Sequence, residues 1–507
     1  MRVKHAKKNV IYGTMTYVLL MALTFVNRRI FIDVLGQDMA GLQGLLQNLL
    51  SLLNLVESGV GMAIMFSLYK PFAEDDRIQI KSTVTLYSKI YKISGTILLV
   101  GGIILSGCLG IFVKNQIPMG YARICFILYI IDTTLTYYFS YKTCMLYASQ
   151  SGYVISFWDF IFKFLRSAVQ IIVLFVFKSF LVFILIQIIT NIGYLVTINY
   201  IISKKFPWFK STEVSTVQGK DNIIKNIKAL FIHKIGSFVV FGTDNIVISY
   251  FINLKTVAMY TNYSMVISFC QNFINKIFDG LTASIGNLLT EKDSEKAFQV
   301  FNKLMFLNFW ISSFVTISLY NTLDDFVRIW LGKEFVLDNI VIIVLLMNFY
   351  ITTMRMCIDK FKESGGLYYE DRYAPLFEIT INLVFSIVLV NYIGLVGVFI
   401  GTLISNLTVI FWVKPKIVFK NVFNRGLGEY FKRYIGYMSL GIIPLGLTIY
   451  LGRAINFDSL FITFILKVIL NIVVINLTYI IIFYRNKEFL YYKNLVMKKL
   501  GVSKFKN

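Results

Sequence analysis

Long apolar runs recur along this 507-residue chain and constrain its fold more than any other feature. Each run approaches the roughly 20 residues that an α-helix needs to cross the hydrocarbon core of a bilayer. Charged residues make up only 15% of the chain, against about 25% in a soluble domain, so the runs predict membrane-spanning helices. The predicted spans are 9–31, 39–66, 92–113, 123–144, 154–177, 180–202, 223–252, 254–291, 304–323, 339–357, 376–393, 396–413, 434–451 and 460–483.

These spans predict an all-α polytopic membrane protein with about 14 transmembrane helices. At roughly 36 residues per span and loop, they leave no room for a separate soluble domain. The longest polar stretch in the middle of the chain, 203–222, is expected to be a cytoplasmic linker. The first apolar run is too long for a cleaved signal peptide, so we expect it to stay as the first span.

The basic residues predict the orientation of the chain. Its formal net charge is +23, which we attribute to loops held on the cytoplasmic side rather than to a nucleic-acid partner. With an even number of spans, the basic loops all fall on one side, and both termini are cytoplasmic. The basic groups are Arg2, Lys4, Lys7 and Lys8; Lys70, Arg77 and Lys81; Lys204, Lys205, Lys210 and Lys220; Lys414, Lys416, Lys420 and Arg425; and Arg485, Lys487, Lys493, Lys498 and Lys499.

Cysteines and short motifs give no sign of a cofactor. No CxxC pair occurs among the five cysteines, so we expect no disulfide and no metal site. The chain also lacks a Walker A loop and an HExxH motif, which excludes the usual nucleotide-driven and zinc mechanisms. The cysteines are Cys108, Cys125, Cys144, Cys270 and Cys357.

A weak internal repeat relates the two halves of the chain. Arg28 to Ile32 ends the first span much as Asp244 to Ile248 ends the seventh, and a link of similar length follows each. The next span carries an acid before glycine in both halves. Internal repeats are common in secondary transporters, with the substrate site at the repeat interface. Chance similarity between apolar helices remains the alternative.

Two hairpins resemble a known family. The segment FIDVLGQDMAGLQGLLQNLLSLLNLVESGVGMAIMFSLYKPFAEDD is similar to the first hairpin of bacterial polysaccharide repeat-unit flippases of the Wzx type. The segments HKIGSFVVFGTDNIVISYF, YTNYSMV and SIGNLL resemble the corresponding hairpin of the second lobe. These flippases belong to the multidrug/oligosaccharidyl-lipid/polysaccharide exporter superfamily. The likeness extends to helix number and loop pattern over nearly the whole chain.

The resemblance implies two six-helix lobes around a central cavity that opens alternately to each side. It places the lobes at 1–202 and 223–420, with two accessory helices and a basic tail at 421–507. The implied activity is transfer of undecaprenyl-diphosphate-linked oligosaccharide from the inner to the outer leaflet for capsule, exopolysaccharide or O-antigen synthesis. The protein would be non-enzymatic, lie in a bacterial plasma membrane, contact its lipids, and work with a polymerase and chain-length proteins. A specific sugar contact does not map onto any position.

A diphosphate needs cations along its route, because the ideal cost of moving an ion into hydrocarbon is on the order of 20 kcal/mol. Arginine is the best partner for phosphate because its planar fork donates two hydrogen bonds at once. Each candidate also has a structural alternative, either snorkelling to the interface or pairing with a nearby acid, as Asp159, Asp279 and Asp359 could do. The candidate substrate-binding cations are Arg28, Arg29, Lys163, Arg166, Lys234, Lys276 and Arg355.

Acids within the spans are the candidates for ion coupling. Glu57, Asp244 and Asp132 are the main ones, followed by Glu378. An intramembrane carboxylate can carry a proton or help to bind Na⁺, and a salt bridge or helix cap is the alternative. A histidine can titrate near neutral pH, which suits such a role. His233 stands alone at a helix start, where a histidine is more often structural.

Two other functions compete with the flippase. A multidrug or metabolite antiporter of the same superfamily would need fewer cavity cations, because its substrates are often cationic. A membrane polysaccharide polymerase or acyltransferase would need catalytic residues on a large outer loop. The chain has only two histidines, and the largest predicted outer loop is 321–338.

Overall fold

The computed structural model describes residues 2–54, 60–113, 117–216, 242–367 and 370–499. Every regular element in these ranges is helical, which confirms an all-α polytopic membrane protein. Nine of the described helices are long and apolar enough to cross a membrane. The chain folds into two compact units, residues 1–261 and 262–507. The proposed linker at 203–222 lies partly outside the described residues, so the lobe boundaries stay predictions.

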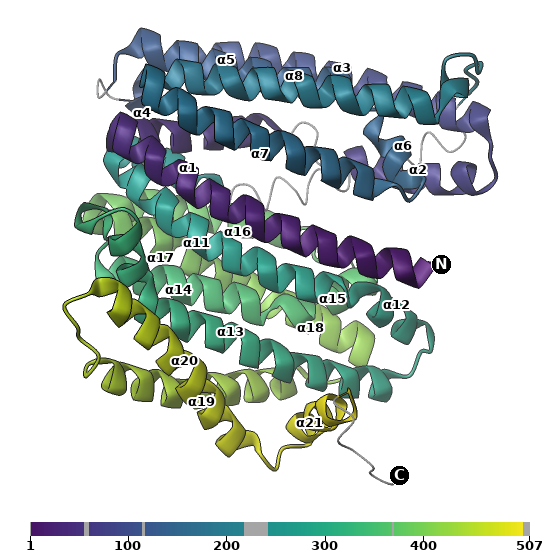
Figure 1. Ribbon diagram of the computed structural model, residues 1–507. Coiled ribbons are helices and arrows are strands. Elements are labelled where there is room, and N and C mark those ends of the chain that lie inside the picture. The colour runs from purple at the N-terminus through teal and green to yellow at the C-terminus, as the bar shows by residue number, and fades with distance from the viewer. Residues whose placement is uncertain (1, 55–59, 114–116, 217–241, 368–369, 500–507) are drawn as a thin grey trace. The chain divides into compact units, whose positions relative to one another are not determined.

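The first unit is a set of long helices packed side by side (Figure 1). Helix α1 packs on α7, α7 on α8, α8 on α5, and α5 on α3. Its helices are α1 (Arg2–Leu53), α2 (Val60–Ala73), α3 (Arg77–Gly107), α4 (Gly110–Val113), α5 (Met119–Phe139), α6 (Thr143–Ala148), α7 (Gly152–Phe177), α8 (Phe180–Lys205), the 3₁₀ turn η2 (Pro207–Phe209), α10 (Asp244–Phe251) and the start of α11 (Leu254–Asp279).

Helix α1 contains two of the predicted spans, which meet at a kink. Gly36 lies at the kink with φ 85°, a backbone conformation that glycine adopts without the strain of a Cβ atom. The expected loop between spans 9–31 and 39–66 is therefore a kink at a single glycine. The polar loop expected after the second span is also short, because Asp76 caps α3 by accepting a hydrogen bond from the Gln79 amide at 3.0 Å.

The second unit is built around the long helix α13, which packs on α14, α19 and α20. Helices α14 and α16 both pack on α17. Its elements after α11 are α12 (Thr282–Thr290), α13 (Ser294–Trp330), the 3₁₀ turn η3 (Lys333–Phe335), α14 (Asn339–Met354), α15 (Met356–Ser364), α16 (Ala374–Ile393), α17 (Leu395–Ser405), the π-helix η4 (Asn406–Ile410), α18 (Phe411–Val418), the π-helix η5 (Phe419–Phe423), α19 (Leu427–Gly452), α20 (Leu460–Phe483) and α21 (Lys487–Lys499).

The expected outer loop 321–338 is wrong over most of its length, because α13 continues through Trp330. Its acids are satisfied within the fold. Asp324 accepts a hydrogen bond from the Tyr263 hydroxyl at 2.7 Å, and Asp325 pairs with Lys467 of α20 at 2.6 Å. The helix can therefore continue where the sequence pattern indicates a polar loop.

Aromatic side chains fill the core of the second unit. The ring of Phe309 on α13 stacks on Tyr437 of α19 at 4.7 Å between centroids, and Tyr479 of α20 contacts the same ring. The Tyr479 hydroxyl also donates a hydrogen bond to the Ser313 hydroxyl at 2.8 Å. Such ring pairs contribute about 0.5–1.5 kcal/mol beyond the area they bury. They attach α19 and α20 firmly to α13.

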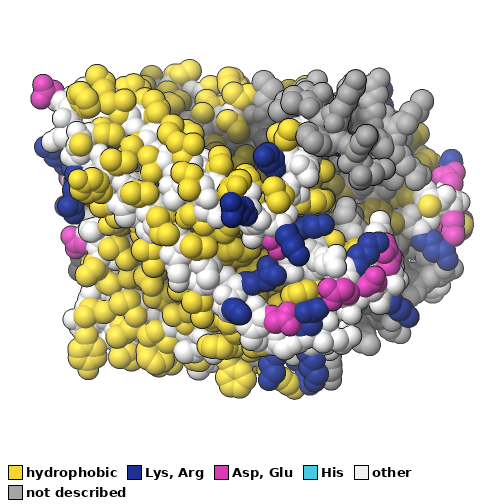
Figure 2. Space-filling model, turned by 90° about the horizontal axis from the view of Figure 1, so that it is seen from below, with side chains coloured by type: hydrophobic (Ala, Val, Ile, Leu, Met, Phe, Trp, Pro, Cys, Tyr) yellow, Lys and Arg dark blue, Asp and Glu magenta, His cyan; other side chains and the backbone are white. Residues whose placement is uncertain are grey.

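One face of the molecule has a broad hydrophobic surface, with Lys and Arg gathered toward one end (Figure 2). Exposed apolar side chains on α19 and α20 include Ile442, Tyr450 and Ile481. A surface of this kind is expected for helices that face lipid tails. Asp and Glu gather at the same end in this view (Figure 2), and the orientation stays a prediction.

Candidate functional site

The first candidate, Arg28, bridges the α1 kink by hydrogen bonds to residues on its far side. It is 8% exposed, and its Nη1 donates to Gln43 Oε1 at 2.9 Å and to the Ala40 carbonyl at 3.5 Å. In a straight helix, residues 15 positions apart are about 22 Å apart. An arginine cannot span that distance, so the contact with Gln43 depends on the bend at Gly36.

Arg29 points differently from its neighbour, as adjacent helical residues must. Its Nε lies 2.7 Å from Asp33 Oδ2, one turn further along α1, and both side chains are substantially exposed. Arg28 and Arg29 are thus already engaged by protein groups in this structure.

Asp132 is the centre of a buried polar cluster between α5 and α8. The Gln187 amide donates to Oδ2 at 2.8 Å, and the Asn191 amide donates to Oδ1 at 2.7 Å. Asn191 also donates to the Thr136 hydroxyl at 3.0 Å. Buried polar groups with complete hydrogen bonding specify one helix register, so this cluster fixes the contact of α5 with α8.

Arg166 on α7 lies within electrostatic reach of Asp132, Asp159 and Tyr129. Its side chain is partly exposed. Among the described residues it has no hydrogen-bond or ion-pair partner. The buried Asp132 therefore attracts Arg166 electrostatically, while the guanidinium N–H groups stay available to donate to a ligand.

Lys163, one turn before Arg166, pairs with Asp159 at 2.8 Å. The spacing predicts this ion pair as one of two alternatives. Both side chains remain more than a third exposed, and exposed pairs contribute only about 0–1 kcal/mol, so a stronger ligand could displace either partner.

Asp244 is the first residue of α10 and is buried. The Tyr260 hydroxyl donates to its Oδ2 at 2.8 Å. The start of α11, which carries Tyr260, packs closely on the second limb of α1, because a Cβ atom on Gly41 would lie 1.9 Å from the Leu254 carbonyl oxygen. Asp244 is thus held at a tight helix contact inside the first unit.

In the second unit, Asp279 pairs with Lys360 of α15 at 2.7 Å, and Lys360 also contacts Glu363 at 2.8 Å. Lys276, one turn before Asp279, is exposed. The sequence spacing predicts a Lys276–Asp279 ion pair as the structural alternative. In the structure Asp279 pairs instead with Lys360 of α15.

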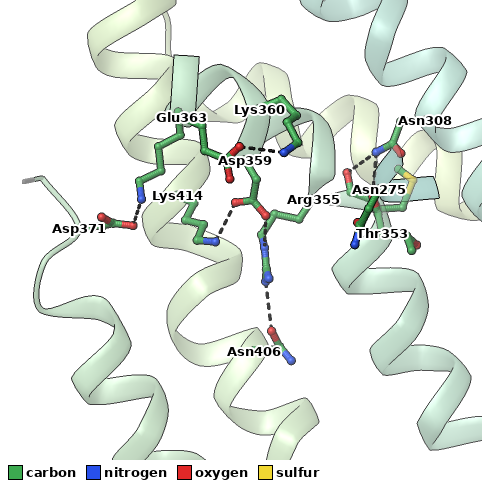
Figure 3. Close-up of polar contacts among 12 residues, drawn as sticks. Asn275, Asn308, Thr353, Arg355, Asp359, Lys360, Glu363, Asp371, Asn406 and Lys414 are labelled. Carbon is green, nitrogen blue, oxygen red and sulfur yellow. Dashed lines mark hydrogen bonds and ion pairs between the residues drawn. The ribbon is translucent and has the colours of Figure 1, made fainter. Parts of the chain in front are cut away.

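Arg355 lies at the break between α14 and α15 and is 7% exposed. Its Nε is 3.3 Å from Asp359 Oδ2, and its Nη1 donates to Asn406 Oδ1 at 3.1 Å (Figure 3). Lys414 of α18 binds the other carboxylate oxygen of Asp359 at 2.8 Å. The i,i+4 pair predicted for Arg355 is confirmed, and two further helical elements join it.

Asn406 begins the π-helix η4, and π-helical turns are often found at functional positions. Glu378 on α16 is buried and lies within electrostatic reach of Arg355 and Lys414. Its carboxylate has no hydrogen-bond partner among the described residues. Two cations thus act on two acids, so the group is close to neutral as a whole.

Three candidates lie outside the described residues: Glu57, Lys234 and His233. Among the residues that the structure describes, no group of His, Cys, Asp and Glu could hold a metal ion.

Sequence reasoning missed the partners of the charged candidates. Gln43, Gln187, Asn191 and Asn406 carry the hydrogen bonds that decide what each charge does. The available signal was an amide inside an apolar span, where every polar group needs a partner. The sequence alone does not say which charge each amide serves.

Comparison with known proteins identifies the fold. No protein-family model and no curated protein matches the chain. Among solved structures, the lipid II flippase MurJ in an inward closed conformation matches with a TM-score of 0.67 at 12% identity, covering 94% of this chain and 99% of that one.

Two transporter structures also match. A mutant of the Vibrio cholerae MATE transporter VcmN has a TM-score of 0.58 at 13% identity, covering 84% of this chain and 98% of its own. An inward-facing multidrug resistance MATE family transporter of the MOP superfamily has 0.59 at 14%, covering 78% and 94%. At such identities the likeness shows the fold alone, which is the fold of MOP-superfamily transporters.

Proposed function

We propose that this chain is a flippase that moves undecaprenyl-diphosphate-linked oligosaccharide repeat units from the inner to the outer leaflet by alternating access. The product would serve synthesis of a cell-surface polysaccharide. The fold likeness to a lipid II flippase over 94% of the chain supports a lipid-linked substrate. The hairpins that resemble Wzx-type proteins support an oligosaccharide head group.

The observation that carries the proposal is Arg166. Its guanidinium has no hydrogen-bond or ion-pair partner among the described residues. It lies within electrostatic reach of the buried Asp132, on a helix apolar enough to cross the membrane. Leaving such a group without a ligand is unfavourable in a membrane protein. A diphosphate supplies the anionic oxygens that its planar fork binds best.

The other candidate cations support Arg166 rather than replace it. Arg28 and Arg355 are buried in hydrogen-bonded groups, and Arg29 and Lys163 have acid neighbours that a diphosphate would compete with. Lys276 is exposed, and Lys234 lies outside the described residues. We therefore assign the first phosphate contact to Arg166.

The acids serve the return of the empty carrier in this proposal. Asp132 and Asp244 are buried, and each is held by uncharged donors rather than by a salt bridge. Such carboxylates can take up a proton or Na⁺ without breaking an ion pair. Glu57 is the third candidate for this role.

A multidrug antiporter is the second candidate, and the MATE structures with the same fold favour it. It differs in the charge of its substrate. An antiporter for cations would gain activity, or keep it, when Arg166 is neutralised.

The test is flipping of undecaprenyl-diphosphate-linked oligosaccharide in vesicles that contain the purified protein. Arg166→Ala should slow flipping at least about tenfold, because hydrogen bonds to a charged group contribute about 1.5–3 kcal/mol. Arg166→Lys should recover part of the rate. The matched control is Lys178→Asn, which removes a cation at the end of the same helix, where the left-handed backbone accepts asparagine.

Unchanged flipping in Arg166→Ala, with the variant folded, would overturn the assignment of this residue. Efflux of a cationic drug by wild-type vesicles that do not flip the lipid would favour the antiporter instead.

A further inference from the structure

Two adjoining cavities lie along the same helices of the second unit. The larger is an apolar groove of about 400 Å³ between α13, α14 and α19. The smaller is a polar pocket of about 250 Å³ that also reaches α20. Tyr320 and Ile449 line both. The groove residues used below are Met347, Met438, Ile442 and Leu445. The pocket residues are Asn321, Asn339, Thr448, Arg453, Lys467 and Asn471.

The polar pocket closes one end of the apolar groove. On α19 the groove runs from Met438 to Ile449, and the pocket continues to Arg453. On α13 the groove ends at Tyr320, which the pocket shares, and the pocket continues to Asn321. The α19 stretch along the groove is about 16 Å long at 1.5 Å per residue. That length matches one leaflet of hydrocarbon, about half of the 30 Å core.

The pocket offers one cation without a partner. Arg453 is exposed, and its guanidinium has no hydrogen-bond or ion-pair partner among the described residues. Lys467 is neutralised by Asp325 at 2.6 Å. The balance of charge therefore suits a ligand with a single negative charge better than a diphosphate.

The pocket also offers a buried donor without an acceptor. Asn471 is 1% exposed, and its Oδ1 accepts a hydrogen bond from the Asn321 amide at 2.8 Å. Its Nδ2 has no hydrogen-bond partner among the residues that the structure describes. A buried donor left in this state costs about 1–3 kcal/mol, so a ligand oxygen at this position would stabilise the pocket.

We propose that the pocket binds the phosphate of an anionic glycerophospholipid, with one acyl chain lying in the groove. Arg453 would bind the phosphate, and Asn471 Nδ2 would donate to a phosphate or ester oxygen. By the predicted topology the pocket lies at the outer ends of the helices, so the lipid comes from the outer leaflet. This site is independent of the flippase proposal, because it needs no flipping to be detected.

Native mass spectrometry of the purified full chain tests the site with two lipids, anionic phosphatidylglycerol and neutral phosphatidylcholine. Arg453→Ala should weaken phosphatidylglycerol binding about tenfold, because it removes a charge-assisted contact, and should weaken binding of the zwitterionic phosphatidylcholine less. Lys333→Ala is the matched control, since Lys333 is an exposed cation in the α13–α14 connection and does not line the pocket.

Asn471→Leu is a second test, because it removes the buried amide donor. Asn321 keeps its hydrogen bond to Thr448 at 2.9 Å in this variant. It should also weaken phosphatidylglycerol binding severalfold. Ile442→Trp should weaken binding of the same lipid by filling the groove, where Ile442 is 61% exposed. Arg453→Lys should restore part of the affinity that Arg453→Ala loses.

Wild-type affinity for phosphatidylglycerol in both Arg453→Ala and Asn471→Leu would overturn the proposal, as would equal binding of the two lipids by the wild-type protein. Displacement of phosphatidylglycerol by an equal concentration of undecaprenyl diphosphate would also overturn it, by assigning the groove to a prenyl lipid. Thermal unfolding of each variant checks that it is folded. If one variant fails to fold, the other two decide.

Discussion

At the scale of the residue, the partner of a charged side chain in a membrane helix decides whether that charge is structural or available to a ligand. Arg28 and Arg166 read alike in the sequence, as arginines within an apolar span. In the structure Arg28 donates a hydrogen bond to Gln43 across the α1 kink. Arg166 has no hydrogen-bond or ion-pair partner among the described residues. Arg355 resembles Arg28 in this respect, because it donates hydrogen bonds to both Asp359 and Asn406.

Arg355→Ala is therefore expected to act on stability. It leaves the partly buried Asp359 with Lys414 alone, and removing one member of a fully buried pair costs about 3–5 kcal/mol, which is the upper limit here because the Asp359 side chain is 22% exposed. Thermal unfolding in detergent should show a lower Tm and a lower folded yield. Export per folded molecule should stay near the wild-type value.

The control for this experiment is Arg29→Ala, which removes an arginine from an exposed pair and should change Tm little. A normal Tm together with lost export in Arg355→Ala would instead make Arg355 a substrate contact.

At the scale of the element, close helix contacts depend on glycine. Helices α16 and α17 form a hairpin that turns at Gly394, where φ is 62°. A Cβ atom on Gly401 would lie 2.2 Å from Ser386 Oγ and 2.5 Å from the Ser386 backbone nitrogen. The two helices can pack at this distance only because residue 401 has no side chain.

Gly401→Ala should separate α16 from α17, because a backbone atom cannot move aside as a flexible side chain can. We expect a loss of about 1–3 kcal/mol, as for other overpacked cores, seen as a lower Tm. Gly446→Ala on α19 is the matched control, since a Cβ atom there meets nothing within 4 Å. It should be neutral or slightly stabilising. Equal Tm values for the two variants would contradict the close contact.

At the scale of the whole molecule, the questions are orientation and energy source. Basic residues gather toward one end of the face seen in Figure 2, which agrees with the positive-inside rule. The fold similarity to transporters covers most of the chain but does not fix which end is cytoplasmic.

Reporter fusions test the orientation. Fusions after Lys210 and after Lys420 should report a cytoplasmic position, and a fusion after Lys255 should report an external one. The reason is the alternation of basic and basic-poor loops. An external signal at Lys210 would reverse the proposed placement of the first unit.

The membrane potential should drive the cycle. A diphosphate carries about two negative charges, and each is worth about 2.3 kcal/mol per 100 mV. Outward passage from a negative interior is therefore favoured by roughly 4–5 kcal/mol if the charges cross unneutralised. Collapsing an imposed potential should slow flipping in vesicles.

The carboxylates are tested in the same assay. Glu57→Gln and Asp244→Asn should slow the return of the empty carrier and alter its response to pH or Na⁺. If both variants flip at the wild-type rate and respond as the wild type does, these residues have no coupling role.

The sequence by itself determined the class of fold. A row of apolar runs near the bilayer thickness admits membrane helices and little else, because backbone groups in lipid must be paired within the segment. It also offered local pairs, Lys163 with Asp159 and Arg355 with Asp359, as one of two alternatives, since i,i+4 neighbours meet on any helix, and the structure contains both pairs. These features depend only on local geometry, so they can be read from spacing.

Only the tertiary structure decided which charges are free to bind a ligand. The partners of Arg28, Asp132 and Arg355 come from beyond a kink or from another helix, and no local rule gives that distance. The polar pocket at Arg453 and Asn471 has the same origin, because residues from four helices line it. Long-range packing determines such sites, whereas hydrophobic periodicity determines only the helices that carry them.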